Sequence, residues 1–451
     1  MDDAGHWPVD DPAGVQALRD AGAHSLLVVP LALRGTLLGL LALARCRASP
    51  AFEHEDIGLA GELAAHTALC LDNARRYARE RALAATVQRR LLPQRPVAHT
   101  GLDTAYAYQP GRSAGGSWFD VIRLSSSRTL LVIGQVTGEG IHAATAMGQL
   151  RTAVHALAAL DLETADLLAR LNDTVLQLAH ERGTLPTADA PHGEPFTAAH
   201  SYVAYDPVTL TCTAGRAGLP PPLLAHPDGT VSPLELPDGP RLGSTDVTPF
   251  AATTLGVAED SVLVLATPAL LDAVDPEHIR HLLSGSEASV QDLCDSIVYA
   301  SDRSRPTDGD AILVLARSHA LPADRTAAWR LEADHEAPAF ARALTCDWLT
   351  GRQLPDEAVF AAEVIVSELV TNAVRYGIPP VHLRLILDRT LTLEVSDGSS
   401  TSPHLRHARA TDEGGRGLFI ISQLADHWGT RHRPDGKTIW AELRLSTSTT
   451  S

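Results

Sequence analysis

Residues 367–375 read Ser-Glu-Leu-Val-Thr-Asn-Ala-Val-Arg, within a longer segment, Pro355 to Gly377, that has the pattern of an amphipathic helix. Proline at its start and glycine at its end are typical helix boundaries. Valine and alanine recur on one side, whereas Glu368 and Asn372 lie four residues apart on the polar side. An ordinary solvent-exposed helix would also show such a face. Its meaning therefore depends on the segments that follow.

Three later segments carry glycine at positions where a ligand could approach the backbone. An expected strand, Leu391–Ser396, ends in Asp397-Gly398; residues 413–418 read Glu-Gly-Gly-Arg-Gly-Leu at the start of an apolar helix; and residues 436–440 read Gly-Lys-Thr-Ile-Trp. Glycines let backbone N–H groups come close to a phosphate, and a helix N-terminus adds a favourable potential. By itself, the glycine cluster at residues 413–418 does not identify the ligand.

Taken in this order, the four segments resemble the GHKL ATPase superfamily, in particular its anti-sigma-factor serine kinase branch, over about Leu331 to Leu445. The resemblance implies a Bergerat-type α/β sandwich that binds ATP with Mg²⁺. It implies that Asn372 binds the Mg²⁺ ion, that Glu368 is the general base and that Asp397 reads the adenine amino group. The other cofactor-binding residues that it implies are Gly398, Gly415, Arg416, Gly417 and Thr438, with Ser399–Asp412 as a mobile lid.

The reaction implied is phosphoryl transfer to a serine or threonine hydroxyl of a partner protein, with Glu368 orienting that hydroxyl. In the family the acceptor is an anti-anti-sigma (STAS-type) protein, and the kinase domain also sequesters a sigma factor. We expect the same two partners here. Tyr376 stands where relatives often carry histidine, and we expect this change to affect the rim of the site more than its chemistry.

The middle of the chain resembles the stage II sporulation protein E family of metal-dependent, PPM-type serine phosphatases, over about Leu91 to Arg317. The segments that carry the resemblance are residues 87–93, 115–121, 133–140, 217–222 and 311–314. The resemblance implies an α/β sandwich. Enzymes of this type use two metal ions, held by aspartates, to activate the water that attacks phosphoserine.

Most of the carboxylates that this chemistry needs are replaced. Serine stands for the first aspartate of Gly-Gly-Asp-Trp-Tyr-Asp, glutamine for that of Gly-Asp-Val, proline for that of Thr-Asp-Gly, and glycine for the first of the final Asp-Asp pair. The degenerate phosphatase positions are Ser117, Asp120, Gln135, Pro268, Gly309 and Asp310. Hard divalent cations need several oxygen ligands with net negative charge. We therefore expect no Mn²⁺ or Mg²⁺ there, and a folded pseudophosphatase.

Two alternatives to a kinase with a pseudophosphatase module stay open. One is an active PPM-type protein serine/threonine phosphatase that recruits its metals through Asp120, Glu139, Asp308 and Asp310; Mn²⁺-dependent phosphate release would reveal it. The other is a non-catalytic scaffold whose conformation ATP fixes. That protein would bind ATP and never transfer the phosphoryl group.

The N-terminal part resembles the second half of a GAF sensory domain. Two strands, His24–Leu31 and Thr36–Leu43, are expected around the Arg34-Gly35 turn, before a helix from Glu53 to about Leu92. Because only half of such a domain is visible, we expect a truncated start or a vestigial sensor, and we assign no ligand. Apolar residues at spacings of three, four and seven along the helix suit pairing into a homodimer.

The length of the chain sets the number of domains to expect, and its net charge limits the partners. With 451 residues the chain exceeds one hydrophobic core, and its fold class is multidomain α/β and α+β. The expected order is residues 1–80 (GAF-like), 81–95 (connecting helix), 96–317 (phosphatase-like), 318–326 (linker) and 327–447 (histidine-kinase-like ATPase). The net charge of -17 argues against nucleic acid or an anionic membrane as partner. Five scattered cysteines and the lack of a signal sequence predict a cytoplasmic protein.

Overall fold

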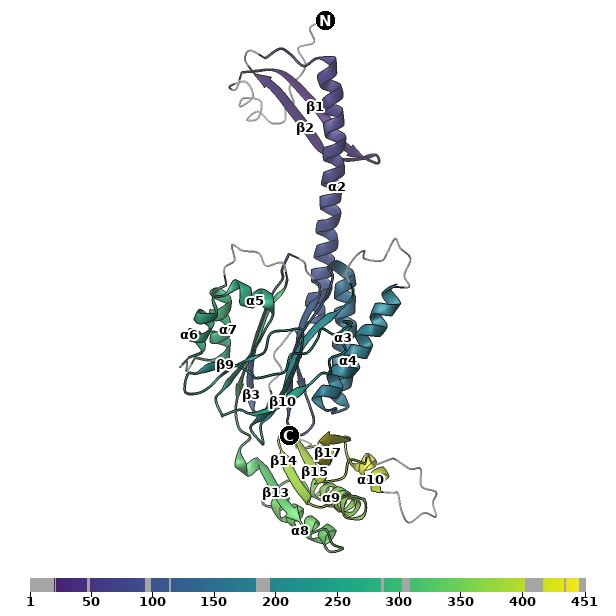
Figure 1. The fold of residues 1–451 in the computed structure, drawn as a ribbon, viewed down its shortest axis with the longest axis vertical. Coiled ribbons are helices and arrows are strands. Elements are labelled where there is room, and N and C mark those ends of the chain that lie inside the picture. The colour runs from purple at the N-terminus through teal and green to yellow at the C-terminus, as the bar shows by residue number, and fades with distance from the viewer. Residues whose placement is uncertain are drawn as a thin grey trace, which may run out of the picture. The chain divides into compact units, whose positions relative to one another are not determined.

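The computed structural model describes residue 20 and residues 22–46, 49–93, 99–112, 115–183, 195–284, 288–301, 309–401, 417–433 and 435–445. Contacts within the chain divide it into two compact units, Met1–Leu83 and Ala84–Ser451. Figure 1 shows the elements of both units. Among the described residues, no helix combines the length and the apolar character needed to cross a bilayer.

The first unit contains an antiparallel hairpin of β1 (Ala23–Leu33) and β2 (Thr36–Cys46). Arg34 and Gly35 form its turn with φ of 50° and 79°, the left-handed conformation that tight hairpins favour. The two strands and their turn are confirmed. Helix α2 (His54–Leu91) begins in this unit, and Ala64 and Ala68 of this helix pack on the hairpin. The homodimer seam along α2 stays a prediction.

The second unit begins with two stacked, antiparallel five-stranded sheets, ordered β10-β7-β6-β5-β4 and β3-β12-β11-β8-β9. The strands are β3 (Leu102–Gln109), β4 (Ser117–Arg123), β5 (Thr129–Val136), β6 (Ala198–Asp206), β7 (Thr211–Ala217), β8 (Leu223–Ala225), β9 (Val231–Pro233), β10 (Ala252–Gly256), β11 (Val262–Ala266) and β12 (Ala311–Ser318). The central strands are buried on both faces, which explains their nearly continuous apolar sequence.

Helices cover both outer faces of this sandwich (Figure 1). They are α3 (Gly140–Ala159) and α4 (Thr164–Gly183) on the first sheet, and α5 (Pro268–Ala273), α6 (Pro276–Leu283) and α7 (Val290–Tyr299) on the second. The last three are only 6, 8 and 10 residues long, too short for a helical pattern to show in the sequence.

The C-terminal part is a third five-stranded antiparallel sheet, ordered β13-β14-β15-β17-β16. Its strands are β13 (Thr326–Leu331), β14 (Val381–Leu387), β15 (Thr390–Asp397), β16 (His427–Arg433) and β17 (Gly436–Arg444). Helices α8 (Ala337–Thr350), α9 (Asp356–Tyr376) and α10 (Gly417–Leu424) form one layer over it. The predicted helix from Pro355 to Gly377 is confirmed, with these two residues as its caps. Residues 323–325 of the expected linker form a short 3₁₀ turn.

The other face of this sheet is covered by the turn between β4 and β5. Leu391 to Val395 of β15 are all buried, although every second side chain points away from α9. Glu394 is on that second face, paired with Arg384 at 2.5 Å and with Arg431. The turn residue Ser126 donates its hydroxyl to Glu394 and its backbone N–H to Glu442, the latter at 3.1 Å. A buried polar junction therefore joins the phosphatase-like and ATPase-like parts.

Candidate functional site

The polar face of α9 forms one wall of the candidate nucleotide site. Glu368 and Asn372 are both half-buried on this face. The start of α10 lies directly against them: a Cβ atom placed on Gly417 would be 2.6 Å from Glu368 Oε2 and 3.5 Å from Asn372 Nδ2. A side chain at residue 417 would force the Glu368 carboxylate to move. The structure therefore brings together the three residues that the sequence assigned to the phosphate end.

Asp397 lies at the C-terminal end of the same helix. A Cβ atom on Gly377, which caps α9, would be 2.7 Å from Asp397 Cγ, and the Gly398 N–H donates to the Ile378 carbonyl at 2.6 Å. From Glu368 to Gly377 the helix rises about 14 Å. The site thus has two ends along α9, with Glu368 and Asn372 at one end and Asp397 at the other.

Strand β17 supplies the floor beneath Asp397. Thr438, predicted to bind at the adenine end, is fully buried but pairs with Ser396 and not with Asp397. Its side chain therefore points to the other face of the sheet, where its hydroxyl lies 2.8 Å from that of Ser396. Lys437 directly faces Asp397 across the β15–β17 ladder, and its Nζ is 3.0 Å from Asp397 Oδ1. Gly436 has a φ of 144°, and a side chain there would overlap the Asp397 carbonyl. The adenine end predicted from sequence is therefore a tightly packed polar corner.

These residues fit Mg-ATP. A carboxylate and a side-chain amide oxygen are ligand types that suit Mg²⁺, and the glycine at residue 417 lets the start of α10 approach Glu368 and Asn372 closely. The buried carboxylate of Asp397 offers a hydrogen-bond acceptor to an amino group. Gly415 and Arg416, and all of the expected lid beyond Thr401, lie outside the described residues.

The altered phosphatase positions also come together, with one exception. Ser117 and Gln135 are paired across β4 and β5, and a Cβ on Gly309 would be 3.3 Å from Gln135 Nε2. Thr267, which precedes Pro268 at the start of α5, donates its hydroxyl to the Asp310 carbonyl at 2.9 Å. The exception is Asp120.

Asp120 lies three residues after Ser117 on β4, so its side chain points to the opposite face, toward α3. Both of its oxygens are engaged there: Oδ2 lies 2.7 Å from Arg151 Nε and 2.7 Å from His155 Nε2, and Oδ1 accepts from Arg151 Nη2 at 3.2 Å. The carboxylate that the sequence suggested as a retained metal ligand is instead an ion-pair partner on the helix side of the sheet.

Asp310 remains at the altered site and is also engaged. Gln88, near the end of α2, donates its amide to Asp310 Oδ2 at 2.7 Å and to the Ser117 carbonyl at 2.8 Å. The Gly111 N–H donates to Asp310 Oδ1 at 3.1 Å, and the Tyr108 hydroxyl donates to Gln88 Oε1 at 2.8 Å. Within the described ranges, which omit Asp308, no cluster of three or more His, Cys, Asp or Glu is placed to bind a metal.

Sequence reasoning missed the residues that engage these carboxylates. Arg151 and His155 lie four residues apart on one face of α3, a spacing that the sequence does show. Nothing in the sequence pairs them with Asp120, because the contact depends on how α3 packs over β4. Lys437 lies in the Gly-Lys-Thr-Ile-Trp segment, but its position opposite Asp397 follows only from the register of β15 and β17.

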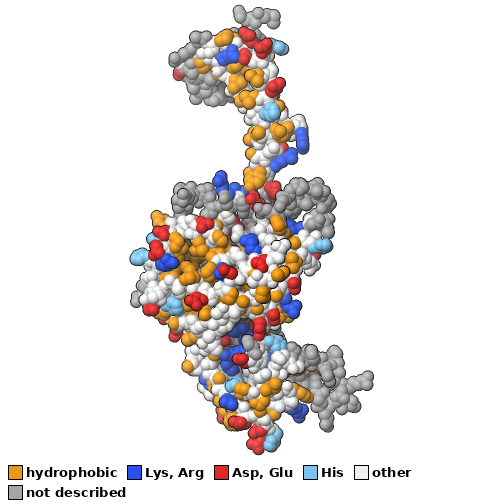
Figure 2. Space-filling view, in the orientation of Figure 1, with side chains coloured by type: hydrophobic (Ala, Val, Ile, Leu, Met, Phe, Trp, Pro, Cys, Tyr) orange, Lys and Arg blue, Asp and Glu red, His pale blue; other side chains and the backbone are white. Residues whose placement is uncertain are grey.

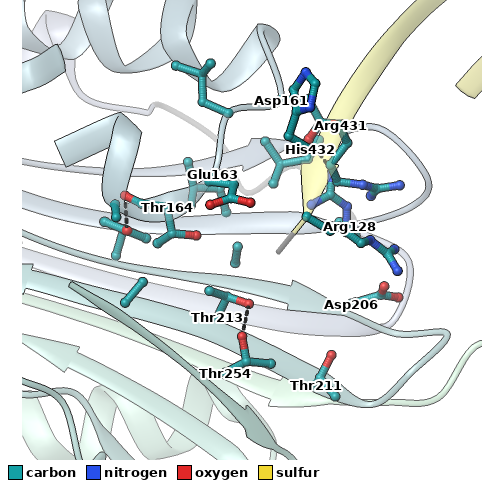
Figure 3. Close-up of a pocket in the computed structure, with 18 of the residues that line it drawn as sticks. Arg128, Asp161, Glu163, Thr164, Asp206, Thr211, Thr213, Thr254, Arg431 and His432 are labelled. Atoms are coloured by element: carbon teal, nitrogen blue, oxygen red, sulfur yellow. Dashed lines mark hydrogen bonds and ion pairs between the residues drawn. The ribbon is translucent and has the colours of Figure 1, made fainter. Parts of the chain in front are cut away.

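A cavity of about 530 Å³ lies beside the junction of the phosphatase-like and ATPase-like parts. Figure 3 shows Arg128, Arg431 and His432 at one end of it, with Glu163 and Thr164 toward the other. Burial, followed by the nearby charge of Arg431, lowers the pKa of Arg128. With Arg128 and Arg431 on one side and Glu163 on the other, the lining carries both signs of charge. On the face seen in Figure 2, acidic and basic side chains of the described residues are likewise interspersed.

Three family models match the chain: the GAF domain at residues 3–71, stage II sporulation protein E at 125–319 and the histidine kinase-like ATPase domain at 331–443.

Among solved structures, the RsbU and RsbW domains of Rv1364c from Mycobacterium tuberculosis are 22% identical, with a TM-score of 0.42, and the match covers 76% of this chain and 95% of that one.

Two phosphatase structures are also similar to the chain. The PP2C domain of SiaA from Pseudomonas aeruginosa is 16% identical, with a TM-score of 0.42, covering 54% of this chain and 98% of that one. A phosphatase and regulatory fragment of SpoIIE from Bacillus subtilis is 12% identical, with a TM-score of 0.38, covering 49% and 64%. The three family models show that the chain contains, in this order, a GAF domain, a SpoIIE-type phosphatase domain and a histidine kinase-like ATPase domain.

Proposed function

We propose that this chain is an ATP-dependent protein serine/threonine kinase of the anti-sigma-factor type, acting in partner-switching control of a sigma factor. The observation that carries the proposal is the arrangement along α9: Glu368 and Asn372 face the glycine that begins α10, and Asp397 is buried at the other end of the helix. Its acceptor would be an anti-anti-sigma protein of the STAS type.

Mg-ATP, when bound, supplies the phosphoryl group, and its metal ion offsets the negative charge of the phosphates. Asn372 would hold the metal, and Asp397 would accept a hydrogen bond from the adenine amino group. Glu368 is half-buried beside Gly417, where it would accept the proton of the acceptor hydroxyl. These roles divide binding, base recognition and proton transfer among three side chains of known position.

The test separates binding from transfer. The full chain would be incubated with radiolabelled ATP, Mg²⁺ and a panel of purified STAS-domain proteins from the same organism. We expect label on a serine or threonine of one panel member, and Glu368→Gln should abolish the label while ATP still binds. ATP binding with no transfer to any panel member would favour a scaffold that ATP merely holds in one conformation.

We also propose that the phosphatase-like domain has lost its metal chemistry. The support is that Asp120 faces Arg151 and His155 on the helix side of β4, while Asp310 is held by Gln88 and the Gly111 N–H. A cation at this site would have to displace the present partners of Asp310, and Asp120 points away from it on the other face of β4. The competing proposal is an active phosphatase, and Mn²⁺-dependent release of phosphate from the phosphorylated STAS partner would establish it.

A further inference from the structure

Lys437 is the only lysine in a chain of 451 residues whose other 36 basic residues are arginine. It is also one of the most buried charged side chains of the ATPase domain: Lys437 and Asp397 keep 6% and 1% of their side-chain surface exposed. An ammonium group buried to this extent requires a counter-charge and hydrogen-bond acceptors. The contacts of Lys437 therefore show what holds it at the nucleotide site.

The ammonium group of Lys437 donates hydrogen bonds to two acceptors. Its Nζ atom lies 3.0 Å from Asp397 Oδ1 and 3.3 Å from the carbonyl oxygen of Ser399. The Ser399 N–H also donates to Asp397 Oδ1, at 2.8 Å. Within the part of the chain that the structure describes, both donors to Asp397 reach Oδ1, and neither of them bonds to Oδ2. The carboxylate is thus held through one oxygen, and the other is left for a ligand.

A compact ammonium suits this position better than a guanidinium does. Lysine carries three donors on a single atom, whereas arginine presents a planar fork that needs a wider set of acceptors. The available acceptors, one carboxylate oxygen and one carbonyl, converge on a single point. This geometry gives a physical reason for lysine at this position in a chain that otherwise uses arginine.

We propose that Lys437 is a positioning residue that sets the base selectivity of the nucleotide site. It supplies the counter-charge that the buried Asp397 carboxylate requires, and it orients that carboxylate so that Oδ2 accepts a hydrogen bond from an exocyclic amino group. Through Ser399 it ties the chain segment after Asp397 to the same carboxylate. This inference rests on the proposed function, because it assumes that the site binds ATP.

The consequence is a preference for a base with an amino donor. An ionised carboxylate only accepts hydrogen bonds, so adenine can pair with Asp397 Oδ2, whereas the carbonyl oxygen of hypoxanthine would be repelled. Without Lys437 the carboxylate loses its counter-charge and its fixed orientation. ATP should then lose affinity relative to ITP, which differs from it at this group of the base.

The experiment compares the dissociation constants of ATP and ITP, with Mg²⁺, for the full-length wild-type chain and for Lys437→Met. We expect the preference for ATP to fall about tenfold or more, as for loss of a charge-assisted hydrogen bond. The control is Arg444→Met, which removes a cation from an exposed part of the same strand, and it should leave the preference unchanged. An unchanged preference in Lys437→Met would overturn the role of Lys437.

A second measurement needs no variant. Because the chain has one lysine, protein labelled with ¹⁵N at lysine Nζ gives a single ammonium resonance, and this resonance should move on addition of ADP and move differently with IDP. A resonance that stays fixed while ADP binds would refute the inference even if Lys437→Met failed to fold. Wild-type protein that binds neither nucleotide would contradict the proposed function itself, an outcome distinct from ATP binding without a change in preference.

Discussion

Replacing Glu394 by glutamine tests the buried junction on the second face of the ATPase sheet. Glu394 keeps 2% of its surface exposed, forms ion pairs with Arg384 and Arg431, and accepts the Ser126 hydroxyl. Burial alone raises the pKa of a carboxyl group, but the two guanidinium groups outweigh it and hold the pKa of Glu394 far below its usual range. Glutamine keeps the shape and removes the charge.

The expected cost follows from the two cations that the substitution leaves behind. The side chains of Arg384 and Arg431 are 15% and 7% exposed, so neither can be fully hydrated in place. Removing one partner of a buried ion pair typically costs about 3 kcal/mol or more. The Ser126 hydroxyl can still bond to the glutamine amide oxygen, so we expect a loss of about 3 kcal/mol.

Hydrogen exchange is the appropriate assay, because a chain of several domains does not unfold in one step. Amides of β14 and β15 should exchange about 150-fold faster in Glu394→Gln, the equivalent of 3 kcal/mol. The control is Glu332→Gln, which makes the same change at an exposed position. Exchange within about fivefold of wild type, or less than about 1 kcal/mol, would refute the reasoning.

The pH dependence of the stability difference between wild type and Glu394→Gln shows whether the charge of Glu394 causes it. Glu394 has a folded-state pKa below its unfolded value, so its contribution is fully present above the unfolded pKa of about 4.3 and is lost as the pH falls toward the folded value. The difference between wild type and Glu394→Gln should therefore be constant above about pH 5 and shrink below about pH 4. A difference that does not change with pH would point to lost packing instead.

Three further outcomes are expected. Gly417→Ala should weaken Mg-ATP binding in calorimetry, because its Cβ would be 2.6 Å from Glu368 Oε2 and would displace that carboxylate from the phosphate end of the site; unaltered affinity would place the ligand elsewhere. His200 is fully buried, burial lowers its pKa to about 3, and neither ring nitrogen has a hydrogen-bond partner within the described structure. Because the imidazole is protonated in the unfolded chain first, the free energy of unfolding falls as the pH drops below 6.5. His200→Phe should therefore gain about 2 kcal/mol relative to wild type between pH 7 and pH 5, read from hydrogen exchange of the β6 amides, and a constant difference would show that protonation plays no part. Gln88→Leu should cost about 2 kcal/mol in the same assay, because Asp310 and the Ser117 carbonyl lose a buried donor, whereas a neutral effect would mean that water replaces it.

The sequence predicts the long helices and the first hairpin of the fold, because their residue patterns extend over many residues. The helix before Gly377, the long helix α2 and the hairpin around Arg34-Gly35 all follow from periodicity and turn residues. The short helices α5 to α7 did not, since a helical period needs more residues than they have. Local pattern thus sufficed for long elements only.

Some contacts at the candidate sites could be predicted from the sequence, and others depend on packing that the sequence does not show. The positions of Glu368, Asn372 and Gly417 follow from motif order, and the structure brings them together. The pairing of Asp120 with Arg151 could not be foreseen, because it depends on which face of β4 the side chain occupies and on the packing of α3. The junction at Glu394 was also missed, because a glutamate in a strand reads as solvent-exposed until the element that covers it is known.

The most direct test is calorimetric titration of ATP, with and without Mg²⁺, into the full-length wild-type chain and into Asn372→Ala and Asp397→Ala. We expect one site per chain in the wild type, with affinity that depends on Mg²⁺. Binding should be lost in both variants, since each removes a contact at one end of α9. Wild-type protein that binds no ATP, or variants that bind it as well as wild type, would contradict a nucleotide site at this helix.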